Sequence, residues 1–561
     1  MDLQRQLSLL RDLDPDRLSE VELRAVVGTL LLLVEELVRR DAEREAELKR
    51  LREELARLKG QSPPPKFPPA GPGSDSSGGS SEKDRRAREP RKPWQKGQKA
   101  ATLPVDRVVP CGVDRSTLPP DAQFKGYLET VIQDLILRRD NLCFRREQFY
   151  SPSTSKTYTA PLPPGYQGGQ FGPGIQSLLL GLAYGANVTM RLGHRFLTHL
   201  GVSISKGEVS ALLTTRLQAF EAELQAAVDA GLTAAGWTGV DQTSTRVDGQ
   251  SHTCQALDNP LMSYYLTTPR ADRLAVLRAL QVGRPLRYRL DAPALAWFTA
   301  RPAAQWAKRR LAALLSEGWQ SEAAFEALLA RHFSRANAGT QQWLRQAAAL
   351  SAYRQEPCGP RLRCLLTDDA AVFPELTEEQ GLCWVHDARH YYKLSPAFGI
   401  FQAERKAFLK EYWAFYGRLL AYRQAPTPTV AAQLREEFDT LFTREVRYAP
   451  LAACLQRTYA NKERLLLVLR RPELPLHNNG TELAVRQRVR RRDVSFGPRS
   501  EAGRRAWDVY QSLAGTVGKL GLSFFDYLSD RLRQARQIRP LADLIVERGA
   551  ELGIGRSWQA A

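Results

Sequence analysis

The sequence has few cysteines, and none of them stand in a close pair. There are seven, at positions 111, 143, 254, 358, 364, 383 and 454, and no two of them form a CxxC motif. An odd, sparse set of this kind argues against a disulfide framework and for a reducing compartment. The 43% of hydrophobic residues is enough to build sizeable cores instead.

Long apolar runs are also missing. The longest, around Leu30 to Val34, is far shorter than the roughly 20 residues that a membrane-spanning helix needs. The N-terminal residues carry acidic side chains and lack the basic start and apolar stretch of a signal peptide. We therefore expect a soluble, intracellular protein without a membrane partner.

Acidic residues are in short supply. The chain of 561 residues has 80 Lys and Arg against 61 Asp and Glu, which leaves a formal charge of +19. A field of that sign attracts polyanions, and double-stranded DNA is a natural candidate. A ribosome-like or membrane-surface protein, or the arginine-rich composition of a GC-rich genome, would give the same excess. The length predicts two to four structural units.

Residues 1–59 are predicted to form a coiled-coil oligomerisation helix. Its polar interruption lies at Asp41 and Arg44. The a and d positions of the heptads are Val27, Leu30, Val34, Leu37, Leu48, Leu51, Leu55 and Leu58. We favour a homodimer through residues 20–59 over an intramolecular helical hairpin, because a linker isolates this seam from the rest of the chain.

Residues 60–103 read as a disordered linker, first rich in Pro, Gly and Ser and then basic. Arg91 and Lys92 in the basic part are candidate DNA contacts, although a merely solvated linker fits equally well. Residues 104–165 alternate as strands do and predict a small β module. It is expected to lack zinc, because Cys111 and Cys143 cannot close a tetrahedral site without further cysteine ligands.

Residues 166–235 show helical periodicity and are a candidate DNA-binding region. Within 187–216, one helix is expected to end at Gly201, and Ser205 can cap a second helix. This arrangement resembles a helix-turn-helix, in which Lys206 and Arg216 on the second helix would contact DNA. An ordinary pair of packed helices would give the same pattern.

Three carboxylates stand where regular structure is expected to end: Asp241, Asp368 and Glu482. Two-metal phosphodiester chemistry needs such oxygen ligands, and magnesium prefers them. Arg486 and Arg490 follow Glu482 at helical spacing and would contact phosphates from the same face. Taken singly, an Asp before a turn or a Glu in a first helical turn is commonplace, so spacing alone does not select these residues.

Several motifs together resemble the DDE transposases of the insertion-sequence-66 family. The segments are VDQTSTRVDG, LLTDDAAVF, CWVHDARHYYKL, HNNGTELAVR and the closing stretch from RRDVSFGPRS onward. The resemblance implies that Asp241, Asp368 and Glu482 are the catalytic metal ligands, with Asp369 as the alternative to Asp368. It places His386 and Arg389, on a strand after the second aspartate, near the DNA, and Asn478, Asn479 and His477 around the ligands. The family usually has Asp where this chain has His477.

The resemblance further implies a multidomain α+β or α/β protein with an RNase H-like catalytic core over residues 236–530. Helical insertions are expected at about 290–355 and 400–460, and residues 531–561 are expected to form a C-terminal tail. The implied activity is cleavage of element-end DNA and joining of the freed 3′-hydroxyl to target DNA, in the bacterial cytoplasm at the nucleoid. The cofactors would be two magnesium ions, for which manganese can substitute, and element-encoded accessory proteins are possible partners.

Two alternatives stay open at this point. Cys358, Cys364, Cys383 and His386 could suggest a zinc site, but their spacing fits no common one and no zinc is expected. The chain could also be a non-catalytic DNA-binding protein derived from a transposase, although the complete set of Asp, Asp and Glu argues against that.

Overall fold

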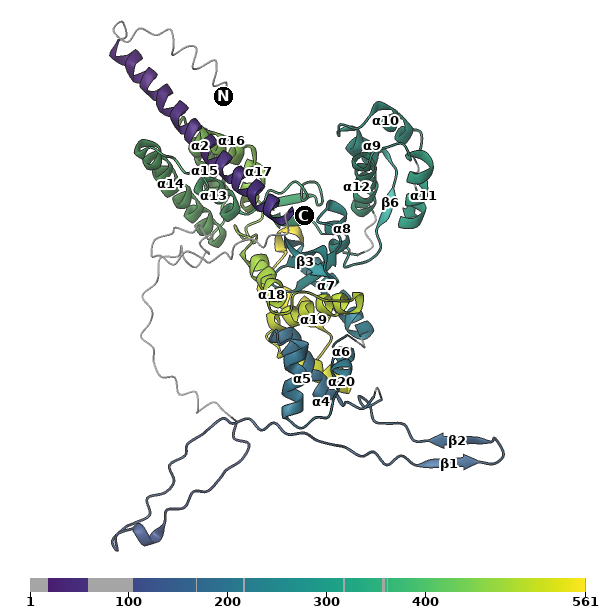
Figure 1. Ribbon diagram of the computed structural model, residues 1–561. Helices are drawn as coiled ribbons and strands as arrows, with labels where there is room; N and C mark the ends of the chain where they lie inside the picture. The colour runs from purple at the N-terminus through teal and green to yellow at the C-terminus, as the bar shows by residue number, and fades with distance from the viewer. Residues whose placement is uncertain are drawn as a thin grey trace.

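The computed structural model describes most of the chain after residue 18. The described residues are 19–58, 104–167, 169–214, 217–315, 318–355, 359–360 and 362–559. The predicted linker at 60–103 lies outside them. The elements form a mixed α+β structure, in which one five-stranded sheet stands in a body of helices and two helical lobes extend from it (Figure 1).

The central sheet is the part of the fold that positions the candidate site. Its strands are β3 (Trp237–Val247), β4 (Gln250–Asp258), β5 (Ser263–Thr268), β8 (Cys364–Thr367) and β9 (Glu379–Leu382), in the order β5-β4-β3-β8-β9. The first three strands in sequence pair antiparallel, whereas β8 and β9 run parallel to β3. Asp248 and Gly249 both have positive φ between β3 and β4, as a tight hairpin turn requires.

Alternation along the strands explains why helices cover both faces of the sheet. On one face, Cys254, Ala256 and Tyr265 pack against Ala484 of α18 (Asn479–Ser495). On the other face, apolar residues of the same strands join the main core with α7 (Leu217–Ala235). The sheet is therefore enclosed between helices, and its strand ends are left to form a site.

Helix α19 (Glu501–Lys519) runs beside the edge strand β5 and satisfies its free backbone groups. The N–H groups of Ser263, Tyr265 and Thr267 donate to side chains of the helix, over 3.2, 2.9 and 2.8 Å. The three acceptors are Thr516, Ser512 and Asp508 respectively. Side chains on this helix thus replace the next strand, and the sheet edge is covered.

The first helical lobe lies between β5 and β8 in the chain. Its elements are α8 (Arg273–Leu280), β6 (Arg287–Arg289), α9 (Ala292–Thr299), α10 (Gln305–Ala312), β7 (Trp319–Ser321), α11 (Glu322–His332) and α12 (Ala338–Gln355). Helices therefore occupy the expected insertion at about 290–355, with a two-stranded β6–β7 ladder that the sequence did not predict. Tyr288 of β6 stacks on Phe325 of α11 within the lobe's core.

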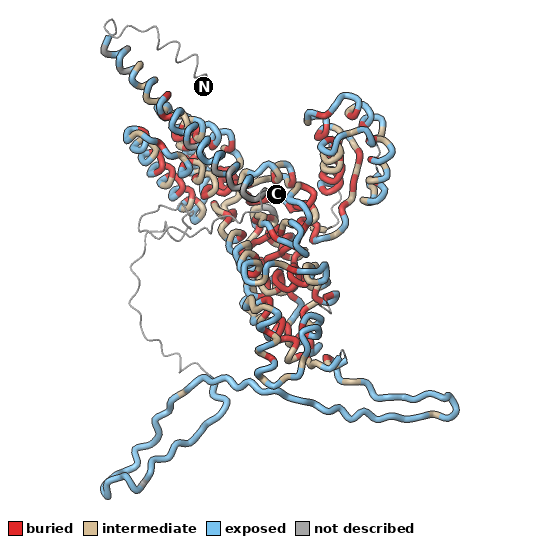
Figure 2. Tube along the Cα trace, viewed as in Figure 1, coloured by how far each residue is buried: buried red, intermediate tan, exposed pale blue. Residues whose placement is uncertain are grey.

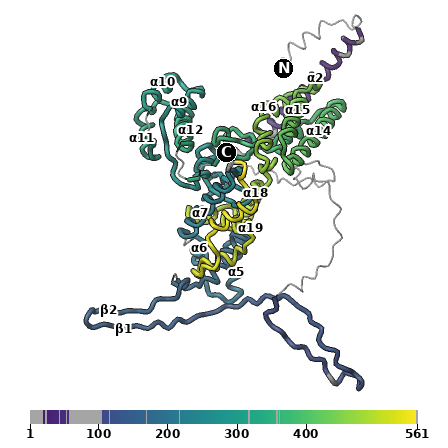
Figure 3. Tube along the Cα trace, turned by 180° about the vertical axis from the view of Figure 1, so that it is seen from behind, coloured from purple at the N-terminus to yellow at the C-terminus, as the bar shows by residue number. Residues whose placement is uncertain are grey.

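The second lobe lies between β9 and α18 and is built around aromatic residues. It contains α13 (Trp384–Tyr392), α14 (Gly399–Gln424), α15 (Pro428–Phe442), α16 (Ala449–Ala460), α17 (Lys462–Leu465) and η5 (Leu466–Leu469). Trp384 is fully buried against Tyr412, Phe415 and Phe438. Figure 3 shows this lobe and the first one on opposite sides of the upper end of the sheet body.

Helix α2 (Glu20–Leu58) packs on the second lobe with only part of its surface. Leu33 is buried there, and the Glu35 carboxylate accepts hydrogen bonds from the backbone N–H of Ala397. The heptad residues with described side chains remain exposed, namely Val27, Leu30, Val34, Leu37, Leu48, Leu51 and Leu55. A long helix is thus present at Glu20–Leu58, and these heptad side chains are left exposed by the described part of the chain.

The strands expected at 122–147 are not formed. In residues 104–165 the structure has a short 3₁₀ turn, η3 (Arg115–Thr117), and one hairpin of β1 (Gln148–Ser151) and β2 (Lys156–Thr159). Figure 2 shows this region as exposed arms outside the helical body. Strands need a third strand or a packed helix to bury an apolar face. These arms have neither, so Phe124, Tyr127 and Leu128 stay exposed.

The helices predicted at 166–235 are present. They are α4 (Pro173–Leu180), the π-helical turn η4 (Gly181–Gly185), α5 (Met190–His199), α6 (Lys206–Thr214) and α7. Gly201 has a φ of 77° after α5, and the Ser205 hydroxyl accepts the N–H of Glu208 at the start of α6. The turn and the cap are therefore as predicted from the sequence.

The C-terminal helices complete the body around α7. They are α20 (Phe524–Arg533), α21 (Leu541–Leu552) and α22 (Arg556–Gln559). Residues that the sequence presented only as a tail thus include a packed helix, because Leu541 and Ile545 of α21 are fully buried. Among the described helices, none is long and apolar enough to cross a membrane.

Candidate active site

Asp241 lies in the middle of β3, beside the end of the parallel strand β8. Its backbone pairs with Ala256 of β4, and its Oδ1 accepts the N–H of Gln242 over 2.7 Å. Burial raises the pKa of the Asp241 carboxyl to about 6, and the nearby charges of Asp368 and Glu482 push in the same direction. A carboxylate in this position gains from a neighbouring cation.

Asp368 follows β8, the fourth strand of the sheet in sequence, and Asp369 follows it. The structure separates the two: Asp369 forms an ion pair with Arg457, and its carboxylate lies 3.8 Å from His390 Nε2. The Asp368 carboxylate accepts the N–H of Ala370 over 3.0 Å, and its charge acts on the pKa of Asp241. Arg457 already pairs with the Asp369 carboxylate, which favours Asp368 as the partner of Asp241.

Glu482 is brought to the site by the tight docking of the α18 N-terminus on β3. The Asn478 side chain donates to the carbonyl of Val240 over 3.0 Å and accepts the Thr481 hydroxyl over 2.6 Å. Gly239 permits this contact, because a Cβ there would lie 2.0 Å from the Thr481 hydroxyl and 2.3 Å from the Asn478 oxygen. Position 239 therefore cannot carry a side chain while α18 keeps this place.

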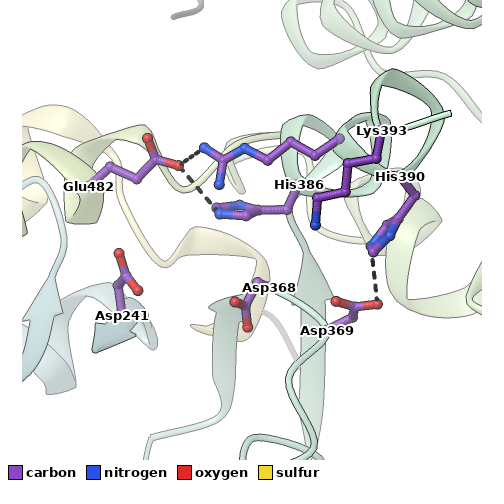
Figure 4. A pocket seen from close by; sticks show the side chains of 8 residues that line it. Asp241, Asp368, Asp369, His386, His390, Lys393 and Glu482 are labelled. Atoms are coloured by element: carbon purple, nitrogen blue, oxygen red, sulfur yellow. Dashed lines mark hydrogen bonds and ion pairs between the residues drawn. The ribbon is translucent and has the colours of Figure 1, made fainter. Parts of the chain in front are cut away.

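The three carboxylates line one open cavity of about 410 Å³. Figure 4 shows Asp241 and Asp368 on the sheet side and Glu482 above them on α18. The remaining lining residues are Asp369, His386, Arg389, His390 and Lys393. Side chains that are far apart in the sequence thus converge, and carboxylates face a cationic wall across the cavity.

That cationic wall is α13, where the sequence predicted a strand. The strand prediction is wrong, because Trp384, Ala388 and Tyr391 are all buried at helical spacing and fill the aromatic core of the lobe. The helix presents its polar side to the cavity. Arg389 pairs with Glu482 over 2.9 Å, and His386 Nε2 lies 3.5 Å from the same carboxylate oxygen.

The histidines of this wall are biased toward the neutral form. Burial lowers the pKa of His386, and the nearby Arg389 lowers it further. His386 Nδ1 is buried and has no hydrogen-bond partner within the described part of the chain. Burial likewise lowers the pKa of His390, with a further contribution from Lys393.

Oxygen donors from Asp241, Asp368 and Glu482 suit a hard divalent cation. Within the described residues, however, no three His, Cys, Asp or Glu side chains already surround a common point where an ion would sit. The reason lies in Glu482, whose carboxylate is turned to Arg389 and His386 (Figure 4). The donor set fits a metal, and a change in the Glu482 rotamer or in its pairing with Arg389 has to accompany binding.

The other residues expected around the site have separate roles. His477 Nδ1 accepts the N–H of Asn479 over 3.2 Å at the start of α18. Arg486 and Arg490 are exposed on α18 outside the cavity, and Lys206 is exposed at the start of α6. Arg216, Arg91 and Lys92 lie outside the described residues.

Three basic residues at or beside the cavity were not predicted from the sequence, namely His390, Lys393 and Arg457. His390 and Lys393 stand four and seven residues after His386, which is the spacing of one helix face. That signal was readable, but the strand prediction concealed it. Arg457 comes from α16, and only the fold brings it to His390 Nδ1, 2.7 Å away.

The cysteines considered for zinc are used in packing. Cys364 is buried in β8, and the buried Cys383 Sγ accepts the N–H of Asn478 over 3.3 Å. Cys383 therefore connects the end of β9 to the start of α18. Cys358 lies outside the described residues.

Comparison with known proteins agrees with the resemblance seen in the sequence. Residues 334–506 match the model of the transposase IS66 family. The chain is also 38% identical over 182 residues to the uncharacterized protein y4jO of Sinorhizobium fredii (strain NBRC 101917 / NGR234). That match covers 32% of the chain and 56% of the relative, so the chain spans about half the length of that protein. No solved structure matches.

Proposed function

We propose that the chain is a metal-dependent DNA transposase with Asp241, Asp368 and Glu482 as its catalytic carboxylates. The observation that carries the proposal is their convergence in one cavity, from β3, the end of β8 and the start of α18. The family match covers the second and third of them. The strand order β5-β4-β3-β8-β9, antiparallel and then parallel, supports an RNase H-like core.

The carboxylates would hold two divalent ions, magnesium or manganese. Bound there, such ions activate the attacking oxygen and stabilise the leaving oxygen of a phosphodiester. Burial of Asp241 keeps its carboxylate poorly hydrated and therefore available to a cation. The same three residues serve both water attack, which frees a 3′-hydroxyl, and attack of that hydroxyl on target DNA.

The α13 wall binds and orients the DNA backbone. Arg389 and Lys393 line the same cavity as Asp241. They supply the positive charge that a phosphate needs. Arg389 also holds the Glu482 carboxylate over 2.9 Å in the metal-free site. We assign Arg389 two partners in succession, Glu482 before the metals and DNA bind and a phosphate oxygen afterwards.

More distant parts of the chain bind DNA and a second copy. Arg486 and Arg490 extend the basic surface along α18, and Lys206 presents a cation at the start of the helix that follows the α5–α6 turn. The exposed heptad face of α2 is available for a parallel homodimer. These assignments make element-end DNA and target DNA the substrates, in the bacterial cytoplasm.

The test uses the full chain and a supercoiled plasmid that carries both ends of the element encoding it. Cleavage is followed by end-labelling of 3′-hydroxyls, and joining by recovery of insertions, with magnesium, manganese or EDTA. Asp241→Asn, Asp368→Asn and Glu482→Gln should each reduce both steps to the EDTA level while DNA binding is retained. Asp248→Asn, at the β3–β4 turn, is the matched control and should behave as the parent.

Two results would count against the proposal. Metal-dependent cleavage that survives all three substitutions would move the active site elsewhere. DNA binding without cleavage by the parent, under any metal, would favour the non-catalytic DNA-binding protein instead.

A further inference from the structure

Phe496, immediately after α18, is a large aromatic residue held outside the protein in an unfavourable backbone conformation. Its side chain is 82% exposed, and its φ of 59° lies in the left-handed region. Residues other than Gly, Asn and Asp seldom adopt that region, and bulky ones least of all. Helices usually place glycine at this position. A phenylalanine that is both exposed and strained contributes little to folding.

The backbone on both sides of Phe496 is fixed. Its N–H donates to the carbonyl of Arg492 over 2.7 Å and closes the last turn of α18. Pro498 accepts the N–H of Asp248 from the β3–β4 turn over 2.9 Å. Between them, Gly497 has a φ of 100° and approaches the carbonyl of Arg246 so closely that a Cβ would lie 2.3 Å from it. The ring is therefore presented on a defined support.

The segments that adjoin this ring carry three exposed arginines and three exposed acidic residues, of which Glu501 pairs with Arg504. Arg246, Arg490 and Arg499 are exposed within a few residues of it on the adjoining segments. The nearby Asp493 carboxylate pairs with Arg492 over 3.4 Å, which leaves Asp248 as the other acidic residue of the turn. An exposed aromatic ring among arginines fits a nucleic acid, whose bases offer π faces and whose phosphates offer negative charge. A purely apolar protein partner would leave these arginines unmatched.

Helix geometry relates Phe496 to the candidate active site. Glu482 lies in the first turn of α18 and Phe496 directly follows its last residue, so the two are fourteen positions apart, which is about four helical turns. At about 1.5 Å per residue, the axial separation is about 20 Å. B-form DNA rises about 3.4 Å per base pair, so duplex lying along α18 would span about six base pairs between them.

We propose that Phe496 is a DNA wedge that stacks against an unstacked base about six base pairs from the scissile phosphate. The inference rests on the proposed function for the location of that phosphate, but it concerns DNA distortion, not chemistry. Apolar side chains inserted at a base step unstack it and kink the duplex. The strained, exposed ring is thereby explained by what it does to DNA.

The experiment measures base unstacking without catalysis. The full chain is bound in EDTA to element-end duplexes in which 2-aminopurine replaces one adenine at a time, and permanganate probes the thymines. The parent should brighten one position about five to seven base pairs from the cleavage site. Phe496→Ala should abolish that signal and weaken binding roughly fivefold to 150-fold, the effect of losing one base-stacking contact. Phe496→Trp should retain the signal.

Two further variants separate the wedge from a structural role. Val494→Ala removes another exposed apolar side chain of α18, which is 48% exposed, and should leave both readouts at the parent level. Phe496→Gly suits the left-handed conformation, so it should melt at or above the parent temperature and still lose the fluorescence signal. A Phe496→Gly chain that unstacks DNA as the parent does would overturn the proposal.

The outcomes also distinguish this proposal from the assignment of the metal site. If the parent binds and unstacks end DNA but never cleaves it, the carboxylate assignment fails and the wedge stands. If the parent binds and cleaves but no base brightens, the wedge alone is refuted. If the parent does not bind and unstack DNA in EDTA, the wedge is refuted, whereas the carboxylate assignment is still decided by cleavage with magnesium or manganese.

Discussion

Helices α13 and α18 form opposing walls of the candidate active site, but their buried charges are satisfied differently. In α18, the Arg488 guanidinium is 1% exposed and donates to Asp508 and Thr267, each over 2.7 Å. In α13, the enclosed Asp387 carboxylate accepts from the neutral hydroxyls of Tyr412 and Thr458, over 3.0 and 2.9 Å, and pairs with no cation among the described residues. Burial consequently raises the pKa of Asp387 to about 6.

Because of this difference, the packing of the two helices should depend on pH to different extents. A paired buried charge keeps α18 in place over the whole range in which both partners stay ionised. An unpaired buried carboxylate makes the packing of α13 depend on pH, because its charged form is poorly solvated. The wall that supplies Glu482 is thus fixed by ions, and the wall that would hold DNA is fixed by neutral hydrogen bonds.

The largest effect is expected from breaking the α18 ion pair. Arg488→Met leaves the buried Asp508 carboxylate with Arg504 as its cationic partner and removes the buried donor to Gln511, which should together lower the free energy of unfolding by about 3–5 kcal/mol. Urea denaturation followed by circular dichroism measures it. Adding Asp508→Asn to the same chain should recover part of the loss. An equal loss in the single and double variants would show that the pair does not hold α18.

Removing the charge in α13 should have the opposite sign. Asp387 has a folded pKa of about 6 against 3.8 in the unfolded chain, so its contribution to stability is present below pH 4 and is lost as pH rises through 6. Asp387→Asn should therefore be more stable than the parent at pH 8, by up to about 3 kcal/mol, and equal to it near pH 4. Thermal unfolding across this range checks it, and a pH-independent difference would contradict the comparison.

Gly239 tests the contact between α18 and the sheet directly. The added methyl of Gly239→Ala meets Thr481 and Asn478, so α18 must shift, at a cost of about 1–3 kcal/mol. The rate of DNA cleavage should fall by more than the loss of folded protein explains, because Glu482 moves with the helix. The matched control is Gly518→Ala on α19, where a Cβ has nothing within 4 Å. Full cleavage activity in Gly239→Ala would mean that the position of Glu482 tolerates the shift.

The smallest effect on folding is expected from the exposed arginines of α18. Arg486→Ala and Arg490→Ala should each change the unfolding free energy by less than about 0.5 kcal/mol. Each should nevertheless weaken DNA binding regardless of sequence and reduce the slope of log affinity against log salt by about one. Binding titrations at several salt concentrations measure both. An unchanged salt slope would remove these residues from the DNA interface.

The arginines of α18 also mark how far the sequence could lead. Counting four and eight residues from Glu482 puts Arg486 and Arg490 on one face of the helix, and both side chains are exposed. Arg488 and Arg491 belong to the same basic segment but are buried. Asp508 and Trp507 of α19 and Tyr184 of η4 pack against them. Local spacing predicts which residues share a helix face, but it does not predict which residues of other elements pack against that face.

The carboxylates and the lobes show the same division. Motif order selected Asp241, Asp368 and Glu482, and helices occupy both expected insertions. The α13 segment was misread because it follows β9 directly and is rich in aromatic residues, which suit strands as well as buried helices. The arms at 104–165 were misread because alternation alone predicts a strand, whereas a stable strand needs neighbours that no local pattern supplies.

The hydrogen bonds between α19 and β5 limit how long the edge strand β5 can be. Four residues of helix rise about 6.0 Å, whereas two residues of strand advance about 6.8 Å. Asp508, Ser512 and Thr516 can therefore follow Thr267, Tyr265 and Ser263 with an error that grows by about 0.8 Å at each step. The two steps that join these three pairs are tolerable and many more are not, so the edge strand has to be short. A single residue inserted in either element would misalign every later hydrogen-bonded pair. The spacing of these residues should therefore tolerate change less well than the identity of any one side chain.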